Sequence, residues 1–278
     1  MTQRKGLLRN TDDKFYTKPE TVDFCIKYIE NYLDLKDQLV IEPSAGNGSF
    51  INAIKKLTSN FHFFDISPDH PEIKKQDYLK LDYACFKNAH IIGNPPFGRQ
   101  SSLAIKFIKK SCEFCESISF ILPKSFKKDT LRRSFHLHFH LLFEIDLPEK
   151  SFLVNEKEHD VPCVFQIWKR ETTPRKITKV EEPVGFSFVK KTEKPDLSFR
   201  RVGVNAGTFD TNVKNKSESS HYFLKTTGSF CFDGIVFENN NTVGPRSISK
   251  QELIRELNRV NKVNQVIRVI QINLTQNN

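Results

Sequence analysis

A short apolar strand that runs directly into a glycine turn and then into a helix most restricts the fold of this chain. The strand is expected at residues 38–42, the turn reads Ser44-Ala45-Gly46-Asn47-Gly48, and apolar helical spacing begins at Ser49. Glycine suits such a turn because it adopts positive φ and lets the backbone come close to other groups. The order predicts an α/β fold whose backbone amides meet a ligand at the carboxyl edge of a sheet.

Short apolar strands continue to alternate with helices along the chain. A helix is expected to begin at Pro19, and the further predicted elements are strands at 61–65, 89–93 and 117–122 and a single helix over 101–116. Such alternation is typical of a parallel sheet covered on both faces. The strands near 141–147 and 161–168 leave no room for a helix between them, so we expect them to pair antiparallel at one edge.

The composition changes after Arg170, where a segment rich in Lys, Glu, Thr and Pro begins. We predict a flexible N-terminus at 1–14, a main α/β domain at 15–170 and a small C-terminal module at 171–278. Ser249 and Glu252 form a capping box flanked by Ile248 and Leu253 as a hydrophobic staple, which predicts a helix near the C-terminus.

The glycine turn favours a nucleoside ligand without a pyrophosphate. Asp65 lies nineteen positions beyond Gly46, a spacing at which an acid can bind ribose hydroxyls. Asn52 occupies the position of the third glycine of the dinucleotide motif, and no lysine follows in the P-loop pattern. These departures disfavour NAD and ATP.

A second motif, Asn94-Pro95-Pro96-Phe97, directly follows the predicted strand at 89–93. Two prolines give a rigid backbone with few donors and leave carbonyl oxygens unpaired. The Asn94 amide oxygen and a neighbouring carbonyl could then accept both hydrogens of an amine, and the Phe97 ring offers a surface on which a base can stack.

The two motifs closely resemble motifs I and IV of class I amino-methyltransferases, and Phe15-Tyr16-Thr17-Lys18-Pro19-Glu20 resembles the motif X that precedes them in N6-adenine DNA enzymes of the gamma arrangement. The resemblance covers about residues 15–170. It implies a Rossmann-like seven-stranded sheet with an antiparallel edge hairpin, S-adenosylmethionine as cofactor, and a small C-terminal α+β module that is a candidate for substrate recognition.

The resemblance also implies roles for individual residues. Asn94, Pro95, Pro96 and Phe97 would be catalytic, with Asn94 and the Pro95 carbonyl binding the amine and Phe97 stacking on the base. Asp65 would hold the cofactor ribose, Ile66 would lie against its adenine and Asp77 would meet the adenine amine. The resemblance also implies a group of residues that would surround the methionine part of the cofactor. These are Thr17, Glu42, Ser44, Ala45, Gly46 and Gly48, and Asn94 would contact the cofactor as well.

A nucleic-acid partner is favoured by the formal net charge of +10. The residues expected to contact it are Lys124, Lys127, Lys128, Arg132, Arg133, Arg200 and Arg201. No apolar run is long enough for a signal peptide or a membrane span, so we expect an intracellular, soluble protein. Cys112 and Cys115 lack a second cysteine pair, and His136, His138 and His140 fit an ordinary surface better than a ligand set, so no metal site is predicted.

The motif order X, I, IV and C-terminal module favours a site-specific adenine-N6 methyltransferase, with DNA preferred over RNA. RNA adenine N6 and ribosomal-RNA guanine N2 are alternatives, because the same Asn-Pro-Pro-aromatic motif serves them. An alternative of another class is a catalytically silent nucleic-acid-binding subunit. The sequence leaves open whether the chain forms a homodimer or needs an accessory subunit.

Overall fold

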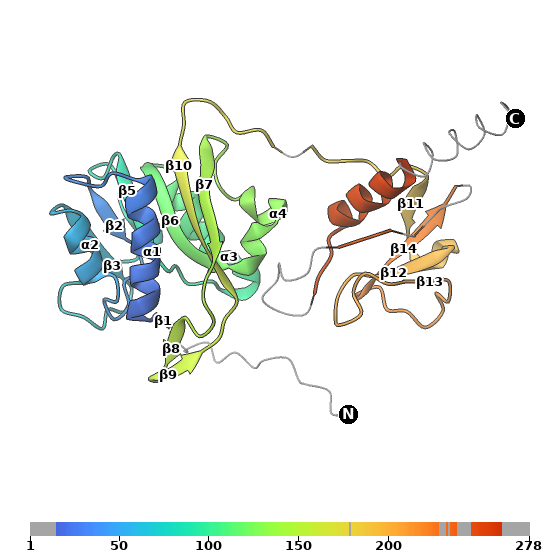
Figure 1. Cartoon of the computed structure of the whole chain (residues 1–278), viewed down its shortest axis with the longest axis horizontal. Coiled ribbons are helices and arrows are strands. Elements are labelled where there is room, and N and C mark those ends of the chain that lie inside the picture. Colours follow the sequence, from blue (N-terminus) through green and yellow to red (C-terminus); the bar gives the residue numbers. More distant parts are fainter. Residues whose placement is uncertain (1–14, 178, 228–231, 233, 238–245, 263–278) are drawn as a thin grey trace, which may run out of the picture. The chain divides into compact units, whose positions relative to one another are not determined.

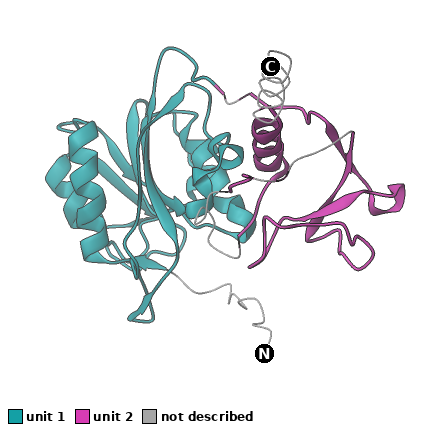
Figure 2. Cartoon of the chain, turned by 45° about the vertical axis from the view of Figure 1, so that its right-hand side comes forward, with its two compact units in different colours: residues 1–176 teal, residues 177–278 magenta. Residues whose placement is uncertain are grey.

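The computed structural model describes residues 15–177, 179–227, 232, 234–237 and 246–262 of the 278-residue chain. The chain divides into two compact units, residues 1–176 and 177–278 (Figure 2). The division lies six residues beyond Arg170, where the composition changes. The predicted flexible segment 1–14 lies outside the described residues.

Unit 1 is built on a seven-stranded sheet. All neighbouring strands are parallel except the β10 pairings with β6 and β7, so the two late strands pair antiparallel at one edge as predicted. The spatial order is β4 (Lys74–Lys75), β3 (Phe61–Asp65), β2 (Val40–Glu42), β5 (Ala89–Gly93), β6 (Cys115–Pro123), β10 (Cys163–Arg170) and β7 (Phe139–Asp146). This arrangement is the Rossmann-like class I methyltransferase fold.

Helices cover both faces of the sheet (Figure 1). The helices α1 (Pro19–Tyr32) and α2 (Ile51–Leu57) pack on one face, and α3 (Ser102–Ser111) and α4 (Asp129–Arg132) on the other. Successive residues of a strand point to opposite faces, so Ile91 joins the core beneath α3 while Ile92 joins the core beneath α1 and α2. Pro19 opens α1 as predicted, since its fixed φ suits the first turn.

The predicted helix over 101–116 is wrong at its end. Helix α3 stops at Ser111, and Cys115 already pairs with Ala89 as the first residue of β6. The guanidinium of Arg170 donates to the carbonyls of Cys112 and Cys115, which fixes the turn between them. Sheet pairing on both sides of β6 therefore overrides the local helical pattern.

A small additional sheet, which the sequence did not indicate, joins the start of the chain to the segment between β7 and β10. It consists of β1 (Tyr16–Thr17), β8 (Phe152–Val154) and β9 (Lys157–His159), with β8 in the middle. Strands of two or three residues are too short for an alternating pattern to identify them.

Unit 2 is a small α+β module, as predicted. Its antiparallel sheet has the order β11 (Phe186–Val189), β14 (His221–Thr226), β12 (Leu197–Arg200) and β13 (Phe209–Asp210). A helix at 250–262 packs on this sheet. The capping box is confirmed, because the Ser249 amide donates to Glu252 Oε2 (2.7 Å) and the Glu252 amide donates to Ser249 Oγ (3.2 Å).

The staple residues Ile248 and Leu253 are both buried in the core of unit 2. In the described parts of both units, no helix combines the length and the apolar character needed to cross a membrane.

Candidate active site

The residues predicted to be catalytic or to bind the cofactor meet at the carboxyl edge of the sheet in unit 1. Glu42 ends β2, Asp65 ends β3 and Asn94 follows β5. The direction of the strand order reverses between β2 and β5, and in open α/β sheets ligands bind beside such a reversal. Ser44 Oγ donates to the Asn94 carbonyl (3.1 Å), so the glycine loop and the Asn-Pro-Pro-Phe motif touch directly.

Both glycines of the loop are needed for its shape. Gly46 has φ +54° and Gly48 has φ +85°, in the region that side chains disfavour. A Cβ atom on Gly48 would lie 2.7 Å from Ile51 Cδ1, so the end of that side chain would have to move in addition to the strain of the positive φ. The Gly46 amide donates to Asp65 Oδ2 (2.8 Å), and the buried Ala45 donates its amide to the Phe64 carbonyl, so the loop is held against β3.

Glu42 is a buried acid beneath this loop, with only 2% of its surface exposed. Its Oε2 has no hydrogen-bond partner in the described part of the chain. Burial, with a smaller contribution from the nearby Asp65 carboxylate, raises the pKa of Glu42 to about 8. An unpaired buried acceptor is unfavourable in a closed core, so this one fits a donor supplied by a ligand.

Asn94 presents a second unpartnered acceptor. Its Nδ2 donates to Thr17 Oγ1 (3.3 Å) and lies 3.5 Å from the Phe15 carbonyl, which fixes the orientation of the amide. Its Oδ1 is buried, and no donor in the described residues reaches it. Thr17, predicted to contact the cofactor, therefore also orients the Asn94 side chain.

The rest of the motif forms a rigid rim. Pro95 is buried, Pro96 is exposed and Phe97 packs partly against the core beneath α1. The Phe97 carbonyl accepts from the Leu103 amide (3.1 Å), which ties the motif to α3. Pro95 directly follows Asn94, and no backbone amide of the described residues donates to the Pro95 carbonyl.

The residues expected at the nucleoside end of the cofactor lie around β3. Asp65 also accepts from the Ser67 amide through Oδ1, and Ile66 is 66% exposed. Asp77 caps a short 3-10 helix by accepting from the Leu79 amide (3.0 Å). The amide of Gln76 donates to the Asp65 carbonyl, so Asp77 follows β4 close to the end of β3.

Two residues at this edge were missed as site residues. Tyr16, which the sequence offered only as part of a motif, donates its hydroxyl to Asp69 Oδ2 (2.5 Å). The Asp69 amide donates in turn to the Gly46 carbonyl (2.9 Å). Asp69 carried no sequence signal, because it lies in an irregular segment outside every motif.

The predicted phosphate-binding residues fall into two groups. In unit 1, Lys124 and Lys127 both pair with Asp146 (2.8 Å each), and Arg132 pairs with Glu144 (2.8 Å). Lys128 and Arg133 lie beside them at the two ends of α4. In unit 2, Arg200 and Arg201 contact main-chain carbonyls, and no carboxylate of the described residues pairs with them.

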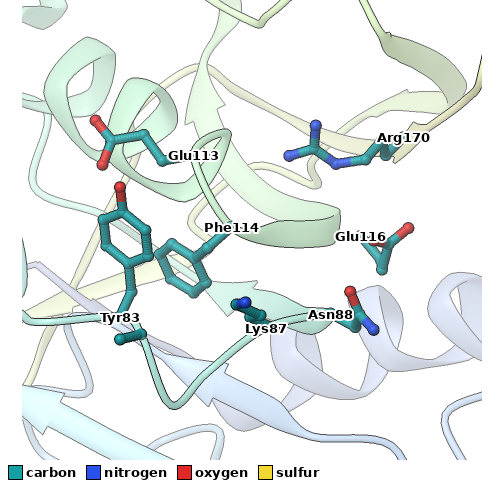
Figure 3. A pocket seen from close by; sticks show the side chains of 8 residues that line it. Tyr83, Lys87, Asn88, Glu113, Phe114, Glu116 and Arg170 are labelled. Atoms are coloured by element: carbon teal, nitrogen blue, oxygen red, sulfur yellow. The ribbon is translucent and has the colours of Figure 1, made fainter.

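A separate pocket of about 280 Å³ lies at the opposite, amino edge of the sheet (Figure 3). It is lined by Tyr83, Ala84, Lys87, Asn88, Glu113, Phe114, Glu116 and Arg170. None of the predicted site residues lines it. Its two acidic and two basic side chains balance each other, so the pocket favours neither an anionic nor a cationic ligand. The chemistry of the carboxyl edge therefore does not depend on this pocket.

Over the described ranges, no group of three or more His, Cys, Asp or Glu side chains is arranged to hold a metal ion. His136 and His138 stack on each other, with ring centroids 5.4 Å apart, and His140 contacts the Thr173 carbonyl.

No protein-family profile and no curated protein sequence matches the chain. Several solved structures are similar in fold to part of the chain. A Pyrococcus horikoshii protein described as an RNA methyltransferase is 12% identical and aligns over 61% of this chain and 93% of its own, with a TM-score of 0.47. The magnesium protoporphyrin IX methyltransferase of Synechocystis PCC 6803, solved with bound SAM, is 14% identical over 55% of this chain and 79% of its own, with a TM-score of 0.44.

An rRNA methylase from Streptococcus thermophilus is also similar. It is 14% identical over 56% of this chain and 98% of its own, with a TM-score of 0.37. The substrates named for these proteins differ from one another. The reaction of this chain therefore has to be inferred from its own residues.

Proposed function

We propose that unit 1 binds S-adenosylmethionine and transfers its methyl group to the exocyclic N6 amine of adenine in a nucleic acid, with DNA preferred. The observation that carries the proposal is Asn94, whose buried Oδ1 has no hydrogen-bond donor among the described residues. Asn94 Oδ1 and the carbonyl of the next residue, Pro95, would supply the two acceptors that the hydrogens of an amino group need.

The carboxyl-edge residues fit the proposed cofactor. Glu42 Oε2 offers an unpaired acceptor to the cofactor's amino group, and the glycine loop allows a ligand to approach its backbone. Asp65 has remaining lone pairs for ribose hydroxyls, with Ile66 and Asp77 at the nucleoside end. S-adenosylmethionine supplies a methyl group already activated by its sulfonium.

Because the methyl group is activated, the protein mainly has to align the amine. Asn94 Oδ1 and the Pro95 carbonyl would accept both amine hydrogens and so orient the nitrogen lone pair. The partly exposed Phe97 would stack on the base. Such alignment can supply most of a rate enhancement without a strong base. In a duplex, the target base must first be flipped out, at a cost of a few kcal/mol.

The net charge of +10 supports a polyanionic substrate, and the order of the motifs favours DNA over RNA. The decisive experiment incubates the full chain with methyl-labelled S-adenosylmethionine and, in parallel, unmethylated DNA and unmodified RNA. Digestion to nucleosides then identifies the labelled base. We expect N6-methyladenosine as its deoxynucleoside in the DNA reaction.

Each outcome of this experiment has a distinct meaning. Label in RNA adenine would keep the chemistry and change the polymer, and label at guanine N2 would replace adenine as the target. Label in neither polymer despite cofactor binding would contradict the proposal for the chain alone and favour a protein substrate, a missing accessory subunit or a silent nucleic-acid-binding subunit.

A further inference from the structure

Strand β1 lies between the two motifs of the site, yet its own backbone pairing is small. It has two residues and pairs with β8 through Tyr16 opposite Leu153 and Thr17 opposite Phe152. A two-residue ladder contributes little stability by itself. The neighbouring Phe15 and Lys18 also contact β8 and β9, and the side chains of Tyr16 and Thr17 add contacts that reach two different loops.

Thr17 contacts the Asn-Pro-Pro-Phe motif through Asn94. Tyr16 contacts the glycine loop, because a Cβ atom on Gly46 would lie only 3.2 Å from Tyr16 Cε1. The Tyr16 hydroxyl donates to Asp69, and the Asp69 amide donates to the Gly46 carbonyl. Tyr16, Asp69 and Gly46 thus form a closed set of contacts over the loop that carries the proposed cofactor site.

We propose that Tyr16 and Asp69 are a pair of positioning residues whose hydrogen bond holds β1 against the glycine loop and so retains the cofactor. This hydrogen-bonded pair is called the latch below. This inference rests on the proposed function for the identity of the ligand. The hydrogen bond between Tyr16 and Asp69 links the N-terminal strand to the segment after β3, which share no backbone pairing. The latch must open for cofactor exchange and close again to hold the loop.

The latch is tested first without ligand, by hydrogen–deuterium exchange of the full chain. Tyr16→Phe keeps the ring and removes the hydroxyl, and Asp69→Ala removes the acceptor. We expect the loop amides of residues 44–48 to exchange about tenfold faster in either variant, the effect of losing one hydrogen bond to a charged acceptor. Tyr28→Phe is the matched control, since the Tyr28 ring packs against Phe24 and Phe143 and its hydroxyl makes no hydrogen bond among the described residues.

The second measurement is the release of labelled S-adenosylmethionine after a chase with unlabelled cofactor. We expect each variant to release it about tenfold faster and to raise the cofactor KM by a similar factor, with kcat changed less than threefold. The double variant should match the single variants, because both remove the same interaction. A general loss of structure would instead lower kcat and speed exchange in the sheet core.

Unchanged loop exchange in both single variants would overturn the latch, as would additive effects in the double variant. A wild-type chain that binds no S-adenosylmethionine would remove the proposed function and the cofactor-retaining role together. The exchange data would then still decide whether Tyr16 and Asp69 hold the glycine loop. Failure of the latch can therefore be distinguished from failure of the proposed function.

Discussion

At the scale of single residues, the candidate site contains two buried acceptors that no donor in the described part of the chain reaches, Asn94 Oδ1 and Glu42 Oε2. An unmade hydrogen bond of a buried polar group costs about 1–3 kcal/mol, so a fold that keeps two of them at one edge carries a measurable penalty. A ligand that supplies the missing donors would offset that penalty on binding. The two residues have different tasks, however, and can be separated by measurement.

We expect Asn94→Ala to lower kcat by a factor of about 10²–10³, the usual effect of removing one preorganised group that aligns or stabilises the reacting atoms. The Kd for S-adenosylmethionine should change less than about threefold, because Glu42 and the glycine loop remain. Titration calorimetry and single-turnover methyl transfer measure the two quantities. Asn60→Ala, at an exposed position next to the amino end of β3, is the control. Equal turnover in the Asn94 variant would contradict its assigned role.

Glu42 predicts a pH dependence of stability. Its pKa is about 8 in the folded protein against 4.5 for the ordinary group, so the folded state keeps a proton that the unfolded state releases. The contribution of Glu42 to the free energy of unfolding is therefore greatest below about pH 4.5. It falls by roughly 3–5 kcal/mol as the pH rises to 8. Urea unfolding at several pH values measures it, and Glu42→Gln should remove this part of the slope. An unchanged slope in that variant would show that other groups cause it.

At the scale of elements, sequence patterns correctly located the helix ends that are determined by neighbouring residues in the chain. Pro19 and the apolar spacing after it define α1, and Ser249 with Glu252 defines the start of the last helix. The end of α3 was mispredicted because pairing of Cys115 with Ala89 decides it. The contacts of Asn94 with Ser44 and Thr17 join residues 50 and 77 positions apart, which no local pattern indicates. The sequence could therefore propose candidate site residues but not the contacts between them.

The confirmed cap gives a prediction for unit 2. Ser249→Ala removes the acceptor for the Glu252 amide, which should destabilise the helix at 250–262 by about 1 kcal/mol. Hydrogen–deuterium exchange of that helix in the full chain measures the change, and the loop amides of residues 44–48 should keep their rates. Ser249→Asp is the control, because aspartate caps equally well. Equal exchange in the alanine and aspartate variants would mean that Ile248 and Leu253 hold the helix without the cap.

At the scale of the whole molecule, the basic side chains behind the net charge of +10 are not equally available to a nucleic acid. Salt-dependent binding to nucleic acid counts cations that reach phosphates and release counterions. Lys124 and Lys127 share Asp146, so part of their charge is already neutralised within unit 1. Arg200 and Arg201 have no carboxylate partner among the described residues of unit 2 and keep their full charge.

Two double variants separate these groups at the same net charge. Arg200→Gln with Arg201→Gln and Lys124→Gln with Lys127→Gln each remove two positive charges, which lowers +10 to +8. We expect the arginine pair to reduce the slope of log Kd against log salt by up to about 1.8 on duplex DNA, at roughly 0.9 per phosphate contact. The lysine pair should change the slope by less than about half as much. Fluorescence anisotropy with a labelled duplex over a range of salt concentrations measures both. Equal slopes of log Kd against log salt in the two double variants would mean that binding depends on net charge alone. A larger decrease of the slope in the lysine double variant would assign the phosphate contacts to the carboxyl edge of unit 1.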